Sequence, residues 1–187
     1  MTRTVYYTAT SLDGFIATAD HSLDWLLSRR SDPDGPMGWT GFEQRVGALA
    51  MGATTYEWMQ AHDPGGWAHS VPAWVFTHRR LTGYPGADIR FTRADVGDVH
   101  AEMVAAAGDR DVWVVGGGDL AGQFADRGLL DELVVSVAPV TLGGGAPLLP
   151  RRLELVRTEH AVNGEFVCVR YDVVRTRPGS ATDPADA

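Results

Sequence analysis

Short runs of apolar residues alternate with amphipathic stretches along most of this chain. The apolar runs predict strands, and several are apolar at consecutive positions, which is typical of central strands covered on both faces. Alternating strands and helices predict an α/β fold in which helices flank a mixed, mostly parallel sheet. The predicted strands span residues 4–9, 48–51, 73–77, 89–91, 112–115, 132–137 and 166–174.

The amphipathic stretches predict helices between these strands. The clearest one spans residues 96–107, where apolar residues recur at helical spacing and Gly108 provides a stop signal. The other predicted helices span residues 41–46, 54–60 and 120–127.

Two glycine-containing segments near the C-terminus predict hairpins. Gly143-Gly144-Gly145 and Asn163-Gly164 separate the last predicted strands, and Asn-Gly is a strong signal for a two-residue turn. We therefore expect antiparallel strands at the C-terminal edge of the sheet. Residues 1–175 are long enough to form one domain with a buried core, and residues 176–187, which lack apolar anchors, are expected to be a disordered tail.

Composition narrows the classes of function. The chain is 44% hydrophobic and 21% charged, as in an ordinary globular protein, and its net charge of −8 with no basic stripe argues against nucleic-acid binding. Cys168 is the only cysteine, and no histidine or carboxylate cluster has metal-ligand spacing, so we expect neither a disulfide nor a metal. No membrane-span or signal-peptide pattern is present, so we expect a cytoplasmic protein.

The candidate chemistry begins where the apolar strand at residues 112–115 runs into Gly116, Gly117 and Gly118 and then into a helical pattern. Glycines let backbone N–H groups approach a ligand closely, and a helix start adds unpaired N–H groups and a positive dipole end. These features predict a phosphate site. The alternative is a glycine turn that only lets the helix pack on its strand. A Rossmann domain is disfavoured, because the motif lies late in the chain and no acidic residue ends the next strand.

Four motifs follow one another along the chain: SLDGFIA at residues 11–17, MGATTYE at 51–57, VVGGG at 114–118 and APVTLGGG at 138–145. In this order they resemble motifs of the dihydrofolate-reductase-like superfamily, and within it the C-terminal reductase domain of the bifunctional riboflavin-biosynthesis deaminase/reductase. This resemblance implies a three-layer fold, NADPH as hydride donor, a small pterin-, pyrimidine- or flavin-like substrate, and a homodimer built through the C-terminal strands.

The resemblance also implies which residues contact NADPH. Ala9 and Ile16 are expected to border the nicotinamide. Two helix N-termini are expected to meet the diphosphate from opposite sides, which suits its charge. The residues concerned are Gly52, Thr54 and Thr55 on one side, and Gly116, Gly117, Gly118, Asp119, Leu120 and Ala121 on the other.

The end of the strand at residues 73–77 is where this superfamily holds the adenosine 2′-phosphate. Thr77, His78 and Arg79 stand there, followed by Arg80. An arginine can grip a phosphate with two N–H groups, which favours NADPH over NADH. The alternative is a solvated basic pair in a loop.

Asp13 and Asp24 are the candidate catalytic residues. Asp13 could protonate a substrate nitrogen directly or through water, or it could bond backbone N–H groups in a tight turn before Gly14. Asp24 is expected at the cleft on the loop after the first strand, with Asp34 and Glu43 as other carboxylates of that region. A helix cap or a solvated charge is the alternative for each of these carboxylates.

Two departures from the riboflavin reductases leave the substrate and the proton donor open. Phe15 stands where those enzymes carry a lysine, and Gly116 stands where they carry a glutamate. The expected function is an NADPH-dependent oxidoreductase. The rivals are a catalytically degenerate nucleotide-binding protein of the same fold and a short Rossmann-like dehydrogenase. The tryptophans could stack on a flat heterocycle or fill the core and rim; they include Trp25, Trp39, Trp58, Trp67 and Trp74.

Overall fold

The computed structural model describes residues 1–63 and 65–174, so the expected tail at 176–187 lies outside the described residues. The strands are β1 (Thr4–Thr10), β2 (Phe15–Ala17), β3 (Val46–Gly52), β4 (Ala73–Phe76), β5 (Ile89–Thr92), β6 (Asp111–Gly116), β7 (Glu132–Val137), β8 (Ala146–Pro147), β9 (Leu155–Asn163) and β10 (Phe166–Val173). The helices are α1 (Asp24–Leu27), α2 (Trp39–Glu43), α3 (Ala53–His62), α4 (Val96–Ala107) and α5 (Gly118–Asp126).

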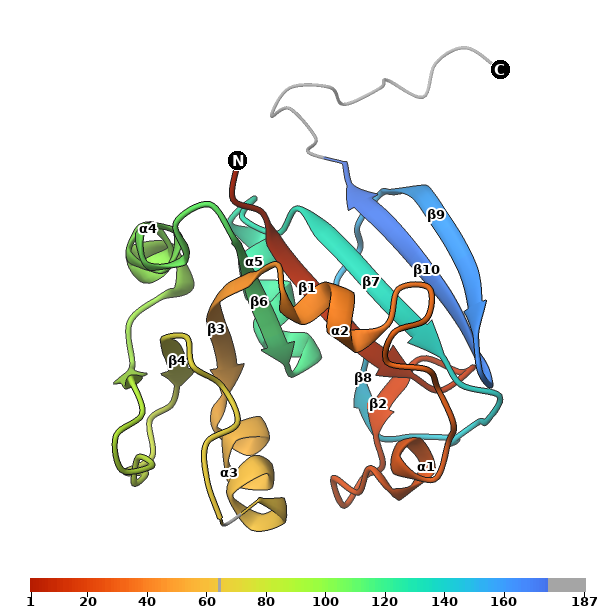
Figure 1. Cartoon of the computed structure of the whole chain (residues 1–187), viewed down its shortest axis with the longest axis horizontal. Helices are drawn as coiled ribbons and strands as arrows, with labels where there is room; N and C mark the ends of the chain where they lie inside the picture. The colour runs from red at the N-terminus through yellow and green to blue at the C-terminus, as the bar shows by residue number, and fades with distance from the viewer. Residues whose placement is uncertain (64, 175–187) are drawn as a thin grey trace, which may run out of the picture.

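One large sheet organises the fold, in the order β5-β4-β3-β6-β1-β7-β10-β9 (Figure 1). The strands from β5 to β7 run parallel, and β10 and β9 pair antiparallel at one edge. The expected mixed, mostly parallel sheet with antiparallel strands at its C-terminal edge is therefore confirmed. The short strands β2 and β8 form a separate antiparallel pair.

Helices and loops cover both faces of the sheet. Apolar residues of α4 and α5 pack with one face of the central strands, around Met103, Phe124 and Tyr6. On the other face, α2 and the segment at residues 65–71 pack around Phe42 and Trp113. Figure 1 shows α2 in front of the sheet and α5 behind it. Central strands with apolar residues at consecutive positions thus have a core on each side, as their sequence predicts.

Local sequence signals account for the ends of the helices. Helix α4 begins after Asp95, whose carboxylate accepts a hydrogen bond from the Gly97 N–H at 2.8 Å. It ends at Gly108, which has a positive φ of 64°, so the predicted stop is confirmed. The helix expected at residues 41–46 instead spans Trp39–Glu43, because Val46 is buried and starts β3.

The two predicted hairpins have different outcomes. Asn163 and Phe166 face each other in the β9–β10 hairpin, so its two loop residues are Gly164 and Glu165 rather than Asn163 and Gly164. Gly143-Gly144-Gly145 joins no hairpin, because the strand that follows, β8, pairs with β2 rather than with β7. Within the described residues, no helix is both long enough and apolar enough to cross a bilayer.

Candidate active site

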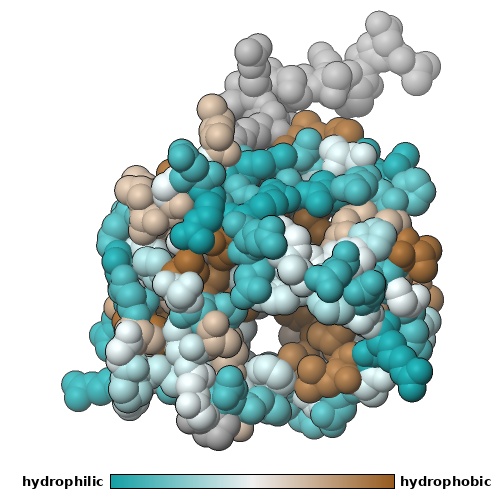
Figure 2. Space-filling view, viewed as in Figure 1, coloured by the Kyte–Doolittle hydropathy of each residue, from teal (hydrophilic) through white to brown (hydrophobic). Residues whose placement is uncertain are grey.

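A cleft of about 700 Å³ opens at the carboxyl ends of β1, β3 and β6. Helix α3 lines one side, and β2, β8 and the start of α5 line the other. Figure 2 shows it as a hollow near the lower centre of the molecule, with hydrophobic side chains on its right-hand side. Ligands of α/β sheets bind in such a crevice beyond the carboxyl ends of the strands.

The N-terminus of α3 faces this cleft without a side-chain cap. Its N-cap residue is Gly52, which is extended at φ −82° and ψ 165°, and the first turn carries no acidic residue. Thr54 and Thr55 follow, and all three residues line the cleft. The unpaired N–H groups and the positive dipole end of α3 are thus available to an anion.

The N-terminus of α5 lines the same cleft. Its N-cap residue is Gly117, extended at φ −89° and ψ −174°, again with no side-chain cap, and the Gly116–Gly117 peptide bond is cis. Gly118 lies so close to β8 that an added Cβ would be 2.2 Å from the Pro147 carbonyl oxygen and 2.3 Å from that of Leu148. Glycine is therefore required sterically at the first residue of α5, and its backbone borders the cleft.

Most residues expected to contact the cofactor line this cleft. Ala121 does not: it is fully buried in the core cluster with Phe124, because the helix turns its side chain toward the sheet. The carboxylate of Asp119 is held by Arg151 at 3.2 Å and by the Gln123 amide at 3.0 Å. The expected residues that line the cleft are Ala9, Ile16, Gly52, Thr54, Thr55, Gly116, Gly117, Gly118, Asp119 and Leu120.

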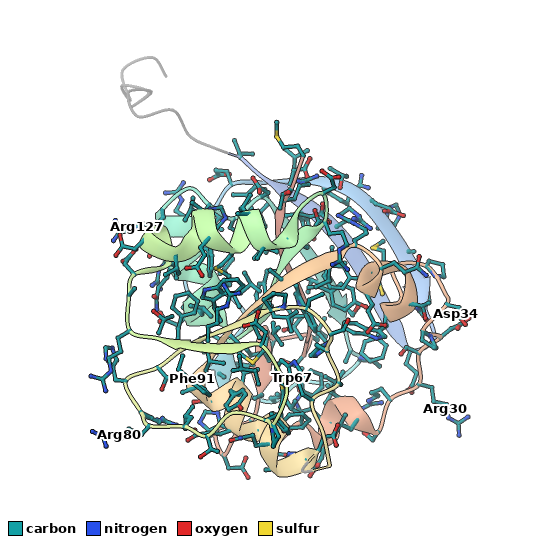
Figure 3. The ribbon with its side chains drawn as sticks, turned by 60° about the vertical axis from the view of Figure 1, so that its left-hand side comes forward. Arg30, Asp34, Trp67, Arg80, Phe91 and Arg127 are labelled. Carbon is teal, nitrogen blue, oxygen red and sulfur yellow. The ribbon has the colours of Figure 1, made fainter. Side chains whose placement is uncertain are left out.

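The basic group after β4 lies beyond the residues that line the cleft. Thr77 is buried, and its hydroxyl accepts a hydrogen bond from the Arg79 N–H at 2.9 Å. The guanidinium of Arg79 forms an ion pair with Glu57 of α3. His78 and Arg80 are exposed, and Arg80 points away from the body of the molecule (Figure 3).

The structure does not bring the two candidate catalytic carboxylates to the cleft. Asp13 accepts hydrogen bonds from the Ser11 hydroxyl at 2.6 Å and from the N–H groups of Leu142 and Gly143 at 3.0 and 2.7 Å. The Ser11 bond, and then the backbone bonds, lower the pKa of Asp13 to about 2, so it holds no proton to donate near neutral pH. Asp24 begins α1 with an exposed side chain and does not line the cleft.

Sequence reasoning missed most of the aromatic and apolar residues that line the cleft. Tyr7 of β1 and Trp113 of β6 line it, together with Trp39 of α2. Leu23, Leu26 and Met59 also line it, as does His21, which has a positive φ of 63°. Trp39 was a candidate for stacking, but aromatic residues inside strands, such as Trp113, cannot be told from core residues by pattern. Among residues 1–63 and 65–174, no three histidine, cysteine or acidic side chains gather as metal ligands.

The sheet, its flanking helices and this cleft define a dihydrofolate-reductase-like fold, as expected. The dihydrofolate reductase of Enterococcus faecalis, solved with NADP(H) and RAB-propyl, superimposes with a TM-score of 0.60 over 91% of this chain and 96% of that one, at 16% identity.

The chain belongs to the RibD C-terminal domain family, whose model matches residues 68–167. The uncharacterised protein YwjB of Bacillus subtilis is 32% identical over 146 residues, which are 78% of this chain and 82% of YwjB. A crystal structure from Shewanella sp. PV-4, of a protein assigned to riboflavin biosynthesis, has a TM-score of 0.77 at 28% identity and covers 92% of this chain and 99% of that one. The resemblance found in the four sequence motifs is therefore confirmed.

Proposed function

We propose that this protein is an NADPH-dependent reductase that transfers hydride to a small heterocyclic substrate. The observation that carries the proposal is that α3 and α5 direct two N-termini, neither capped by a side chain, at one cleft. A diphosphate suits this place, because each helix start favours an anion. The cleft volume of about 700 Å³ also falls within the range of roughly 300–1,000 Å³ usual for ligand and cofactor sites.

In this proposal the diphosphate lies between the two helix starts. Gly52, Thr54 and Thr55 would hold it from the α3 side, and Gly117 and Gly118 would hold it from the α5 side. Ala9 and Ile16, which line the cleft beside them, would border the nicotinamide. A glycine at each N-cap supports this arrangement, because it leaves the N–H groups accessible.

Arg79 would hold the 2′-phosphate that distinguishes NADPH from NADH. It already forms an ion pair with a carboxylate, that of Glu57, and arginine binds phosphate with the same planar pair of N–H groups. The NADP(H) bound to the related E. faecalis enzyme supports the same choice of cofactor.

The chain's own residues would mainly position the reactants. When bound, NADPH supplies a hydride to a C=N or C=O bond of the substrate, and a proton completes the reduction at the nitrogen or oxygen. The apolar side of the cleft would orient the substrate against the nicotinamide and exclude water. Since Asp13 and Asp24 lie away from the cleft lining, we assign the proton to solvent rather than to either carboxylate.

A pair of substitutions at Thr54 tests the cofactor site. Thr54 is exposed in the first turn of α3. Thr54→Glu places a carboxylate that suits the helix dipole, so the fold is retained, but this charge repels a diphosphate. We expect the Kd for NADPH to rise about tenfold or more, measured by NADPH fluorescence. Thr54→Gln, which is similar in size but neutral, is the control. Equal effects of the two substitutions would remove the diphosphate from this site.

The second candidate is a nucleotide-binding protein of the same fold without catalysis. It is favoured by Phe15 and Gly116, and because neither Asp13 nor Asp24 is among the residues that line the cleft. It predicts tight NADPH binding with no oxidation of NADPH when a panel of heterocycles is added.

We also propose that the protein is a cytoplasmic homodimer. Strand β9 supports the dimer, because it is an edge strand with exposed apolar residues such as Val156 and Val162. Sedimentation equilibrium tests the dimer, with a monomer mass as the contradicting result.

A further inference from the structure

We propose that the substrate of this cleft is a planar aromatic ring system that carries no phosphate group. The inference rests on the proposed function, because it concerns the part of the same cleft that is lined by aromatic and apolar side chains. Two features carry it: a wall of aromatic rings, and a lining without lysine or arginine.

The aromatic wall consists of Tyr7, Trp39 and Trp113. The ring centroids of Trp39 and Trp113 are 5.0 Å apart. The ring centroid of Tyr7 lies 6.1 Å from that of Trp39 and 6.4 Å from that of Trp113. The rings meet at 57°, 57° and 83°, so no member of the wall is stacked face to face on another. Such rings bind a flat aromatic ligand by offset stacking and edge contacts.

The polar atoms of two of these rings are already used within the protein. The Tyr7 hydroxyl donates to the Met37 carbonyl oxygen at 3.1 Å, and the Trp113 indole N–H donates to the Tyr7 carbonyl oxygen at 3.1 Å. These hydrogen bonds fix the orientation of the rings. Tyr7, one face of which is stacked on Phe42, and Trp113, which is 8% exposed, therefore present limited apolar ring surface rather than hydrogen-bonding groups, beside the more exposed ring of Trp39.

Other residues add further apolar surface to the cleft. Leu23, Leu26 and Met59 line it, and the flexible side chain of methionine adapts well to flat rings. His69 packs against the wall, 5.8 Å from Trp113 and 6.3 Å from Trp39 between ring centroids. Burial lowers the pKa of His69, which favours the neutral form of its ring.

The lining provides no permanent positive charge for a phosphate. All 16 basic residues of the chain are arginine, and none of those within the described residues lines the cleft. His21 is the histidine of the lining, and Asp119, its acidic residue, lies in the first turn of α5 and is paired with Arg151. A phosphate carries a charge of about −1.5 to −2 at pH 7, and its transfer into an apolar compartment without a cation is costly. The helix starts that could compensate this charge are those assigned to the cofactor.

Three ligands with related ring systems test the inference. Lumichrome has the flat rings without a ribityl chain, riboflavin adds a neutral chain, and FMN adds a phosphate to riboflavin. Binding is followed by tryptophan fluorescence at saturating NADP⁺, so that the cofactor site is filled. We expect lumichrome and riboflavin to bind, and FMN to bind about tenfold more weakly than riboflavin. Equal or tighter binding of FMN would overturn the inference.

A matched pair of variants on α2 shows whether the aromatic wall is the binding surface. Trp39 lines the cleft, whereas Phe42 is buried behind it and stacks on Tyr7 at 4.1 Å. We expect Trp39→Leu to weaken riboflavin binding about tenfold and Phe42→Leu to leave it within about twofold. Similar losses in both variants would indicate a structural effect and contradict the assignment of the wall.

A gain of function completes the test. Leu23→Arg places a guanidinium at the cleft and is expected to improve FMN binding relative to riboflavin about fivefold or more. If the ratio of the Kd for FMN to the Kd for riboflavin does not change, the absence of positive charge does not explain why the cleft excludes a phosphate. NADP⁺ binding to the wild-type protein is measured first: its absence removes the proposed function, whereas riboflavin binding without cofactor still reports on the wall.

Discussion

Gly52 and Gly117 are the N-cap residues of two different helices, and both line the same cleft. They belong to segments about 65 residues apart in sequence, which the parallel pairing of β3 with β6 brings side by side. The carboxyl ends of parallel strands meet at one edge of a sheet, so the helices that follow them start there together. This pairing of helix starts is the structural basis of the proposed cofactor site.

Substitutions at two adjacent glycines should lower stability by different amounts. The Cβ added by Gly118→Ala would overlap the Pro147 and Leu148 carbonyl oxygens, so we expect it to destabilise the protein by about 1–3 kcal/mol or more. The Cβ added by Gly117→Ala would meet the Ile16 side chain at 3.8 Å, an ordinary contact, so the loss should stay within about 1 kcal/mol. Urea unfolding measures the free energy of unfolding of both variants. Comparable values would show that the start of α5 is not in close contact with the Pro147 and Leu148 carbonyl oxygens.

Arg79 should determine the preference between NADPH and NADH. We expect Arg79→Ala to raise the KM for NADPH about tenfold and to leave the KM for NADH unchanged, because only NADPH carries the 2′-phosphate. Glu57→Gln is the matched change on the other side of the ion pair: it frees the guanidinium and should lower the KM for NADPH. Equal effects of Arg79→Ala on both cofactors would refute the assignment.

Asp13 should stabilise the fold in a pH-dependent way. Its pKa is about 2 in the folded protein, below the ordinary 3.8, so the unfolded chain binds more protons between these values. The stabilisation is therefore complete above about pH 4 and is lost as the pH falls toward 2. Asp13→Ala should lower the Tm at pH 7, and the difference from wild type should shrink over that interval. A difference that is the same at pH 7 and pH 2.5 would contradict this.

Glu132 should be far more important for stability than the neighbouring Asp172. The Glu132 side chain is 2% exposed and is paired with Arg170 at 2.7 Å and Arg3 at 3.1 Å. Its replacement by glutamine removes the buried carboxylate that both guanidinium groups share and leaves Arg3 and Arg170 with the exposed carboxylates of Asp172 and Glu159, so we expect a loss of about 1–3 kcal/mol. Asp172 is 46% exposed and also pairs with Arg3, and Asp172→Asn should cost less than about 1 kcal/mol. Equal losses in chemical denaturation would contradict the difference in burial.

The central strands were predictable from the sequence. Both of their faces are buried, so their residues are apolar at consecutive positions, and such a run is easily recognised. Strand β9 was missed since nearly all of its residues are exposed and no run or alternation marks it. Strands β2 and β8 were missed because three and two residues are too few to form a pattern.

The candidate site was predictable in part. The glycine motifs identified both helix starts, because their chemistry is local to a few residues. The aromatic wall was not predictable, since Tyr7, Trp39 and Trp113 come from separate elements and only the tertiary fold brings them together. For Ala121, the register of α5 against the sheet decides that the side chain faces the core, and motif spacing does not contain that information.

The central claim is that the N-termini of α3 and α5 share one NADPH diphosphate while Arg79 holds its 2′-phosphate. Phosphorus NMR of NADP⁺ titrated with the protein tests this most directly, because the diphosphate and 2′-phosphate resonances are separate. The account predicts that both resonances shift in the wild-type protein, and that Arg79→Ala reduces the 2′-phosphate shift alone. If neither resonance moves at saturating protein concentration, the claim is wrong.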